Sequence, residues 1–156
     1  MLQPRFLEAL LKAAKQEGIH TAVDTAGNVS WKEFERILPF TDLFLLDMKA
    51  CDSGLHQEVT GVGNERIKEN LRKLAVGPVP VHIRIPVIPG INATDSEMSG
   101  MSEFLREIGH KGKIELLPMH HLGSGKYESL DLTWRMSDTK APTDSEMARW
   151  RSFFTE

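Results

Sequence analysis

The stretch L-F-L-L-D-M-K at Leu43–Lys49 decides the fold, because its apolar run is short for a helix and rich in residues that fill a sheet. It predicts a buried strand that ends in two opposite charges. Side chains alternate between the two faces of a strand, so Asp47 and Lys49 project to the same side. In parallel α/β sheets, ligands bind at the C-terminal ends of the strands. The motif alone leaves two readings open, a ligand site or an ion pair that closes the strand.

Three other stretches predict strands, and helical patterns separate them. These strands are Ile19–Gly27, Val79–Gly90 and Lys113–His120. The helices begin near Pro4, near Ile67 and after three capping boxes, Ser30-x-x-Glu33, Thr94-x-x-Glu97 and Thr143-x-x-Glu146. Four strands that alternate with helices are typical of a right-handed β/α series, so we expect an α/β fold with one parallel sheet.

Charged or titratable residues fall near the C-terminal end of every predicted strand. They are Asp24, then Asp47 with Lys49, then Arg84, and finally His120. Because the ends of parallel strands meet at one edge of a sheet, we expect these side chains to converge there. Arg84 lies farther back in its strand than the others, so its guanidinium is expected to reach toward that edge.

The other histidines carry less weight than His120, which on its own is more often a structural residue than a ligand. We place His82 and His121 on the opposite strand faces from Arg84 and His120. The segment His121–Lys140 shows little periodicity and is expected to be a long loop, of the kind that is often functional.

Length and composition predict a single domain over residues 1–156. The formal net charge is −3 and no window forms a basic block, so neither nucleic-acid nor membrane-surface binding is expected. No apolar run approaches the roughly 20 residues of a membrane span, and a cytoplasmic location is expected. Cys51 is the only cysteine, so this chain alone forms neither a disulfide nor a cysteine-based metal cluster.

Several motifs, taken together, resemble the activating enzymes of glycyl radical enzymes, the pyruvate formate-lyase activating type within the radical S-adenosylmethionine superfamily. The motifs are D-T-A-G, L-L-D-M-K, H-I-R-I-P-V-I-P-G-I-N, I-E-L-L-P-M-H and L-G-S-G-K-Y, together with the opening M-L-Q-P-R-F-L-E. They run in the family's order from Met1 to about Trp150. The resemblance implies a partial (β/α) barrel, in which the four predicted strands are the last four of a six-stranded radical-SAM barrel.

Two hallmarks of that family are missing from this chain. Its members carry, upstream, a Cys-x3-Cys-x2-Cys loop that holds a four-iron, four-sulfur (4Fe-4S) cluster, followed by a Gly-Gly-Glu stretch that binds the amino group of S-adenosylmethionine. Cys51 cannot replace three thiolates of one loop and is expected to be a plain buried or loop cysteine. The resemblance therefore implies that the cluster belongs to the intact protein only, and that this chain is inactive by itself.

The resemblance also implies roles for residues that match its motifs. Asp47 and Lys49 match an Asp-x-Lys that contacts S-adenosylmethionine, and Arg84 and His120 match an arginine and a histidine near the same cofactor. A monovalent-cation site is implied at Asp24, Thr25 and Asp47.

For the intact enzyme, the resemblance implies one-electron cleavage of S-adenosylmethionine and hydrogen abstraction from a glycine of a partner enzyme such as pyruvate formate-lyase. The implied electron donor is a flavodoxin or ferredoxin, and no side chain of this chain is a catalytic acid, base or nucleophile. His121–Lys140 is a candidate surface for the partner's glycine loop.

Two alternatives remain open. One is a non-enzymatic remnant that serves as a binding or scaffold module; the other, a phosphate-binding domain, lacks a glycine-rich loop. Because removing barrel strands exposes a sheet edge and apolar surface, we also expect self-association.

Overall fold

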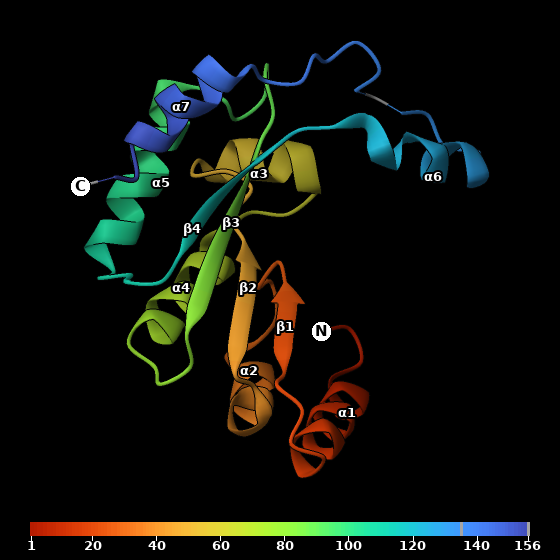
Figure 1. Ribbon diagram of the computed structural model, residues 1–156, viewed down its shortest axis with the longest axis vertical. Coiled ribbons are helices and arrows are strands. Elements are labelled where there is room, and N and C mark those ends of the chain that lie inside the picture. The colour runs from red at the N-terminus through yellow and green to blue at the C-terminus, as the bar shows by residue number, and fades with distance from the viewer. Residues whose placement is uncertain (135, 156) are drawn as a thin grey trace.

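Residues 1–134 and 136–155 are described by a computed structural model, in which four parallel strands form one open sheet (Figure 1). The strands lie in chain order, as β1 (Ala22–Thr25), β2 (Leu43–Asp47), β3 (Val81–Val87) and β4 (Ile114–Pro118). The predicted α/β class, the parallel sheet and the alternation with helices are confirmed. The observed strands are shorter than the predicted ranges.

The described residues also form seven α-helices and two 3-10 helices, which precede, connect or follow the strands. They are α1 (Pro4–Gln16), α2 (Trp31–Ile37), η1 (Leu38–Phe40), α3 (Ser53–Thr60), α4 (Glu65–Ala75), α5 (Asp95–Glu107), η2 (His121–Gly123), α6 (Ser124–Ser129) and α7 (Asp144–Ser152). α1 precedes the first strand, and it lies next to α2 at one end of the molecule (Figure 1).

One face of the sheet is buried under helices. Along β2 and β3 the side chains alternate strictly between buried and half-buried, and along β1 they alternate between exposed and buried. The buried set forms one core with residues of the helices, and from the strands it includes Val23, Phe44, Leu46, Val81, Ile83, Ile85, Val87 and Leu116. Burial of this apolar surface supplies the main driving force for folding.

The opposite face of the sheet is only partly covered by the described residues. It carries Leu43 and Leu45 in the first part of β2, and charged side chains nearer the C-terminal ends of the strands. Both β1 and β4 are edge strands, because each pairs with a single neighbour. In the barrel that the family resemblance implies, this open face is the interior.

The three predicted capping boxes form to different extents. Thr143 and Glu146 make the complete reciprocal box at α7. At α5, Thr94 accepts from the Glu97 backbone N–H, but the Glu97 carboxylate binds elsewhere. The predicted capping box at Ser30 is wrong: Ser30 is the N-cap residue of α2 and has an extended backbone, but its side chain makes no cap hydrogen bond.

The segment predicted as a long loop contains η2 and the short helix α6, which extend away from the body of the molecule (Figure 1). Its helical turns join an aromatic cluster, in which the Trp134 indole N–H donates to His121 and the Tyr127 and Trp134 rings lie 4.8 Å apart. Cooperative local contacts therefore order a stretch whose sequence shows no clear periodicity. In the described residues, no helix is both long and apolar enough to cross a membrane.

Candidate cofactor-binding site

The register of the sheet places Asp47 of β2 directly beside Arg84 of β3 on the open face. The Arg84 Nε donates to Asp47 Oδ1 at 3.0 Å, and its Nη2 donates to the same oxygen at 2.8 Å. The same Nη2 also donates to Asp24 Oδ1 on β1, at 2.6 Å. One guanidinium thus joins carboxylates from two other strands, as the sequence predicted for this edge.

Lys49, the second residue after the end of β2, completes the cluster. Its Nζ lies 3.1 Å from Asp47 Oδ2, so Asp47 is held between an ammonium and a guanidinium. Burial lowers the pKa of Arg84, but its hydrogen bonds with Asp24 and then Asp47 outweigh that effect and raise the pKa above its usual value. The Arg84 guanidinium is therefore charged. The cluster also stays accessible, because the Asp24 side chain is 59% exposed.

The loop that carries Lys49 is anchored by three buried polar side chains. Asn92 donates to the backbone carbonyls of Lys49 and Pro86, at 2.8 and 2.6 Å. Asn64 donates to the backbone carbonyls of Ala50 and Cys51. The Glu97 carboxylate accepts from the backbone N–H groups of Cys51 and Asp52. Such anchoring holds the chain after β2 in one conformation and so limits where the Lys49 ammonium can go.

Two predicted site residues lie outside this network. Thr25 projects to the buried face, opposite to Asp24, and its Oγ1 accepts from the Gly27 backbone N–H. His120 is exposed beyond the end of β4, and among the described residues no hydrogen bond links it to the charged cluster. Thr25 can therefore reach the cluster only through its backbone carbonyl.

Two residues that the sequence analysis set aside or missed share the open face. His82 pairs with Leu45, and Glu115 pairs with Arg84. The placement of His82 on the face opposite to Arg84 was wrong, since residues two apart in a strand share a face. The same period-two count would have found Glu115.

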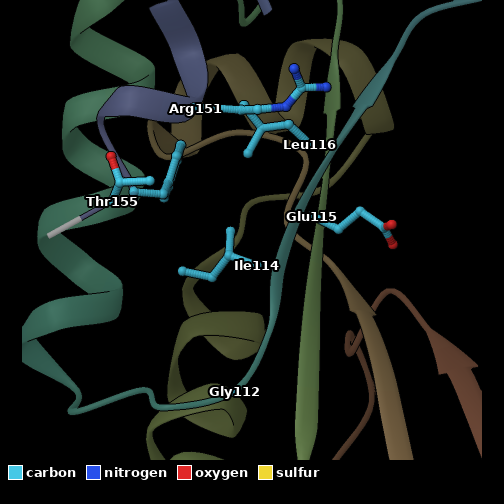
Figure 2. Close-up of a pocket in the computed structure, with 7 residues that line it drawn as sticks. Gly112, Ile114, Glu115, Leu116, Arg151 and Thr155 are labelled. Atoms are coloured by element: carbon cyan, nitrogen blue, oxygen red, sulfur yellow. The ribbon is translucent and has the colours of Figure 1, made fainter. Parts of the chain in front are cut away.

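A groove of about 400 Å³ runs between β4 and the end of α7, lined among others by Gly112, Ile114 and Arg151. Figure 2 shows Glu115 extending from β4 to the side away from Ile114 and α7. The groove thus lies behind the strand and is separate from the charged cluster.

With one cysteine in its sequence, the chain does not supply the thiolates of an iron–sulfur cluster. The described residues contain no group of three or more His, Cys, Asp or Glu side chains that could hold a metal ion. Burial raises the pKa of the Cys51 thiol, which disfavours the thiolate that metals need. Asp24 and Asp47 do converge on one positively charged atom, so a monovalent cation between them would take the place that Arg84 Nη2 occupies here.

The open sheet places this chain in a known class of folds. A radical SAM methyltransferase from Sphaerobacter thermophilus superimposes with a TM-score of 0.61 at 14% identity, over 88% of this chain and 39% of that chain. This likeness shows a shared fold: the open parallel β/α sheet of this chain corresponds to part of that larger chain.

Within that class, a solved domain of the pyruvate formate-lyase-activating enzyme from Bacteroides vulgatus matches with a TM-score of 0.82 at 30% identity, over 98% of this chain and 86% of that domain. The isethionate sulfite-lyase activating enzyme of Nitratidesulfovibrio vulgaris is 45% identical over 131 residues, which are 83% of this chain and 42% of that enzyme. The chain belongs to the family of glycyl-radical enzyme activating enzymes.

The matches cover most of this chain but only part of each curated relative. The chain spans between 42% and 65% of the length of curated relatives that it matches. No protein-family model matches the chain.

Proposed function

We propose that this chain is the part of a glycyl-radical activating enzyme that holds the polar end of S-adenosylmethionine, through Asp47, Lys49 and Arg84. The observation that carries the proposal is the charged cluster near the C-terminal ends of β1 and β2 and at the middle of β3, on a face that the described residues leave open. His120, at the end of β4, is proposed to contact the adenosine side of the cofactor.

The charges of the cluster suit this ligand. S-adenosylmethionine presents a carboxylate, an ammonium and a sulfonium, and such a zwitterion requires both cationic donors and anionic acceptors. Lys49 and Arg84 supply the donors, and Asp24 and Asp47 supply the acceptors. In the free protein these groups neutralise one another, which stabilises them until a ligand exchanges with the internal ion pairs.

A monovalent cation is proposed at the same place, held by Asp24, Asp47 and the backbone carbonyl of Thr25. Two carboxylates this close repel each other unless a positive charge lies between them. Arg84 supplies that charge in the structure. When the guanidinium turns toward a ligand carboxylate, the cation takes over its role between the two aspartates.

The whole activity requires more than this chain. S-adenosylmethionine, when bound in the intact enzyme, supplies the one-electron chemistry that protein side chains lack. We propose that the chain alone binds the cofactor weakly and does not activate a partner, because its one cysteine cannot supply the three thiolates of a cluster loop. The proposed partner is a glycyl radical enzyme, and the proposed electron donor is a flavodoxin or ferredoxin; the relatives' names cover more than one lyase, such as pyruvate formate-lyase and isethionate sulfite-lyase.

Isothermal titration calorimetry with S-adenosylmethionine, in a potassium-containing buffer, tests the proposal. We expect measurable binding by the chain and a loss of at least about tenfold in Asp47→Asn. Asp95→Asn is the matched control, because Asp95 pairs with Arg149 on the surface, away from the cluster. Absence of binding, or equal affinity for both variants, would contradict the proposed site and favour the scaffold reading.

A further inference from the structure

The groove behind β4 continues beyond the residues drawn in Figure 2. A second hollow of about 280 Å³ shares Gly112, Ile114 and Phe154 with the first, so the two form one continuous groove, the β4 groove. Residues of β4, α5 and α7 line it, and its apolar part includes Leu105 and Leu116. Because the β4 groove follows the strand from residue 112 to residue 116, its shape fits an extended chain.

The strand that borders this groove has backbone groups without partners. The Lys113 carbonyl accepts from the Ile83 N–H of β3 at 2.8 Å, so the odd-numbered residues of β4 direct their backbone groups to β3. Those of Ile114 and Leu116 therefore point to the free edge, where none of the described residues bonds to them. Pro118 faces the same edge but has no N–H, so the part of the edge that can pair on both donors and acceptors ends at Leu116.

Basic side chains surround the β4 groove. Arg106 of α5, Lys111 of the following loop and Arg151 of α7 line it and are exposed. Among the described lining residues only Glu115 is acidic; it extends to the other side of the strand (Figure 2) and pairs with Lys113 at 3.0 Å. The whole sequence has a net charge of −3, so this concentration of positive charge is local.

Two of these cations are available for a ligand. Within the part of the chain that the structure describes, neither Lys111 nor Arg151 has an ion-pair partner. An unpaired strand edge binds extended peptides through main-chain hydrogen bonds, and charged side chains beside it select the partner. The edge and the cations thus indicate the same kind of occupant by two independent features.

We propose that the β4 groove binds an extended acidic segment of a partner protein, which adds to the sheet as a fifth strand. Its backbone pairs with Ile114 and Leu116, and its carboxylates lie against Lys111 and Arg151. Side chains of an added strand alternate between two faces, so the acidic residues occupy every second position of the segment. The positions between them face the open side of the sheet.

A second copy of this chain is a poor occupant of the β4 groove. Pairing two copies through β4 would bring the Lys111 and Arg151 side chains of both copies together, and like charges in an interface are unfavourable. The proposal rests on β4, α5 and α7 and not on the charged cluster of the cofactor site, so the two proposals can fail separately.

Fluorescence polarisation of the full chain with labelled peptides tests the occupant. The probe is a short peptide in which glutamate alternates with valine, because valine favours an extended backbone. We expect saturable binding with a Kd on the order of 10–100 µM, and at least about tenfold weaker binding of a peptide with lysine in place of glutamate. Equal binding of both peptides, or none, overturns the proposal.

Backbone methylation of the same glutamate–valine peptide tests the strand pairing. One form is methylated at the valine nitrogens and another at the glutamate nitrogens, and each form loses the donors of one edge of the peptide. At least one form should bind about tenfold more weakly than the unmodified peptide. Equal affinity of all three peptides would mean that charge alone attracts the segment, which contradicts an added strand.

Two variants of the chain locate the surface. Arg151→Glu reverses a charge in the β4 groove and should weaken binding of the glutamate–valine peptide at least about tenfold. Lys12→Glu is the matched control, because it makes the same change in net charge on an exposed position of α1 and should leave the affinity unchanged. Urea denaturation should show equal stability for both variants. Equal weakening by both, or a homodimer that the peptide displaces from the chain, would overturn the proposed occupant.

Discussion

The two faces of the sheet differ in what their side chains contribute. On the covered face, Phe44, Ile83 and Ile85 are completely buried in a continuous apolar core. On the open face, Asp24, Asp47 and Arg84 form ion pairs that water still reaches. Apolar burial gives stability with little specificity, whereas exposed ion pairs give little stability and a specific charge pattern. In each strand, the side chains on the covered face thus stabilise the fold, and those on the open face are available for binding.

The largest expected effect is a loss of stability when a core residue of the covered face is truncated. Phe44→Ala removes a ring that lies 5.5 Å from that of Phe34 and is 0% exposed. We expect the free energy of unfolding to fall by about 3–5 kcal/mol, which is a large part of a typical domain's stability. Leu45→Ala, one residue along on the open face, should lower it by only about 1 kcal/mol. Urea denaturation measures both, and equal losses would contradict the assignment of the faces.

The next effect concerns the link between the two faces. Asn92 is 1% exposed and holds the ends of β2 and β3 together through Lys49 and Pro86, while its own Oδ1 accepts from the Ile88 backbone N–H. Asn92→Ala leaves these groups without partners, so unfolding free energy should fall by roughly 2–3 kcal/mol. Asn92→Asp keeps the acceptor but turns a carboxylate oxygen toward the Lys49 and Pro86 carbonyls, so its loss should at least equal that of the alanine variant. A clearly smaller loss would contradict the role of the donated bonds.

A third effect sharpens the contrast, because it should change binding and leave stability nearly intact. Arg84→Gln removes the guanidinium that joins the two aspartates. Since the three side chains are 21% to 59% exposed, the change in unfolding free energy should stay below about 1 kcal/mol. Affinity for S-adenosylmethionine should fall at least about tenfold, by calorimetry. Arg84→Lys should not restore it, because one ammonium cannot occupy the positions of both Nε and Nη2.

The faces also differ in how far the sequence predicts them. The alternation in L-F-L-L-D-M-K was enough to predict β2 and to place Asp47 and Lys49 on the same side, because period-two burial is a local property. The convergence of Asp24, Asp47 and Arg84 followed from the parallel order of strands. Their direct ion pairs depended on the register between strands, which no single segment contains.

The supporting residues were beyond sequence reasoning for a related reason. Glu97 has the spacing of a capping box, yet its carboxylate binds the backbone N–H groups of Cys51 and Asp52, some 45 residues earlier. Asn64 and Asn92 look like ordinary turn residues in the sequence. A polar side chain chooses among many partners of similar energy, and only the tertiary arrangement decides which lies within reach. Self-association and the cation site stay predictions.

The smallest expected effect compares the two ends of β2. Asp42, just before the strand, is fixed by the fold: hydrogen bonding from the Lys15 ammonium, and then from the Thr21 backbone N–H, lowers its pKa to about 2. Because the folded state binds the proton less readily than the unfolded state, whose carboxyl has the ordinary value of 3.8, the Asp42 contribution is complete above that pH and is lost between it and about pH 2.

Asp42→Asn should therefore flatten the dependence of stability on pH between about 3.8 and 2, and it should leave cofactor binding at neutral pH unchanged, because Asp42 lies at the opposite end of the strand from Asp47. Urea midpoints across that range, with Asp47→Asn as the paired variant, measure the difference. An unchanged slope in Asp42→Asn would mean that the Lys15 pair is open in solution. A loss of cofactor affinity in the same variant would mean that the two ends of β2 do not act independently, and that the division between folding and binding residues fails along the strand.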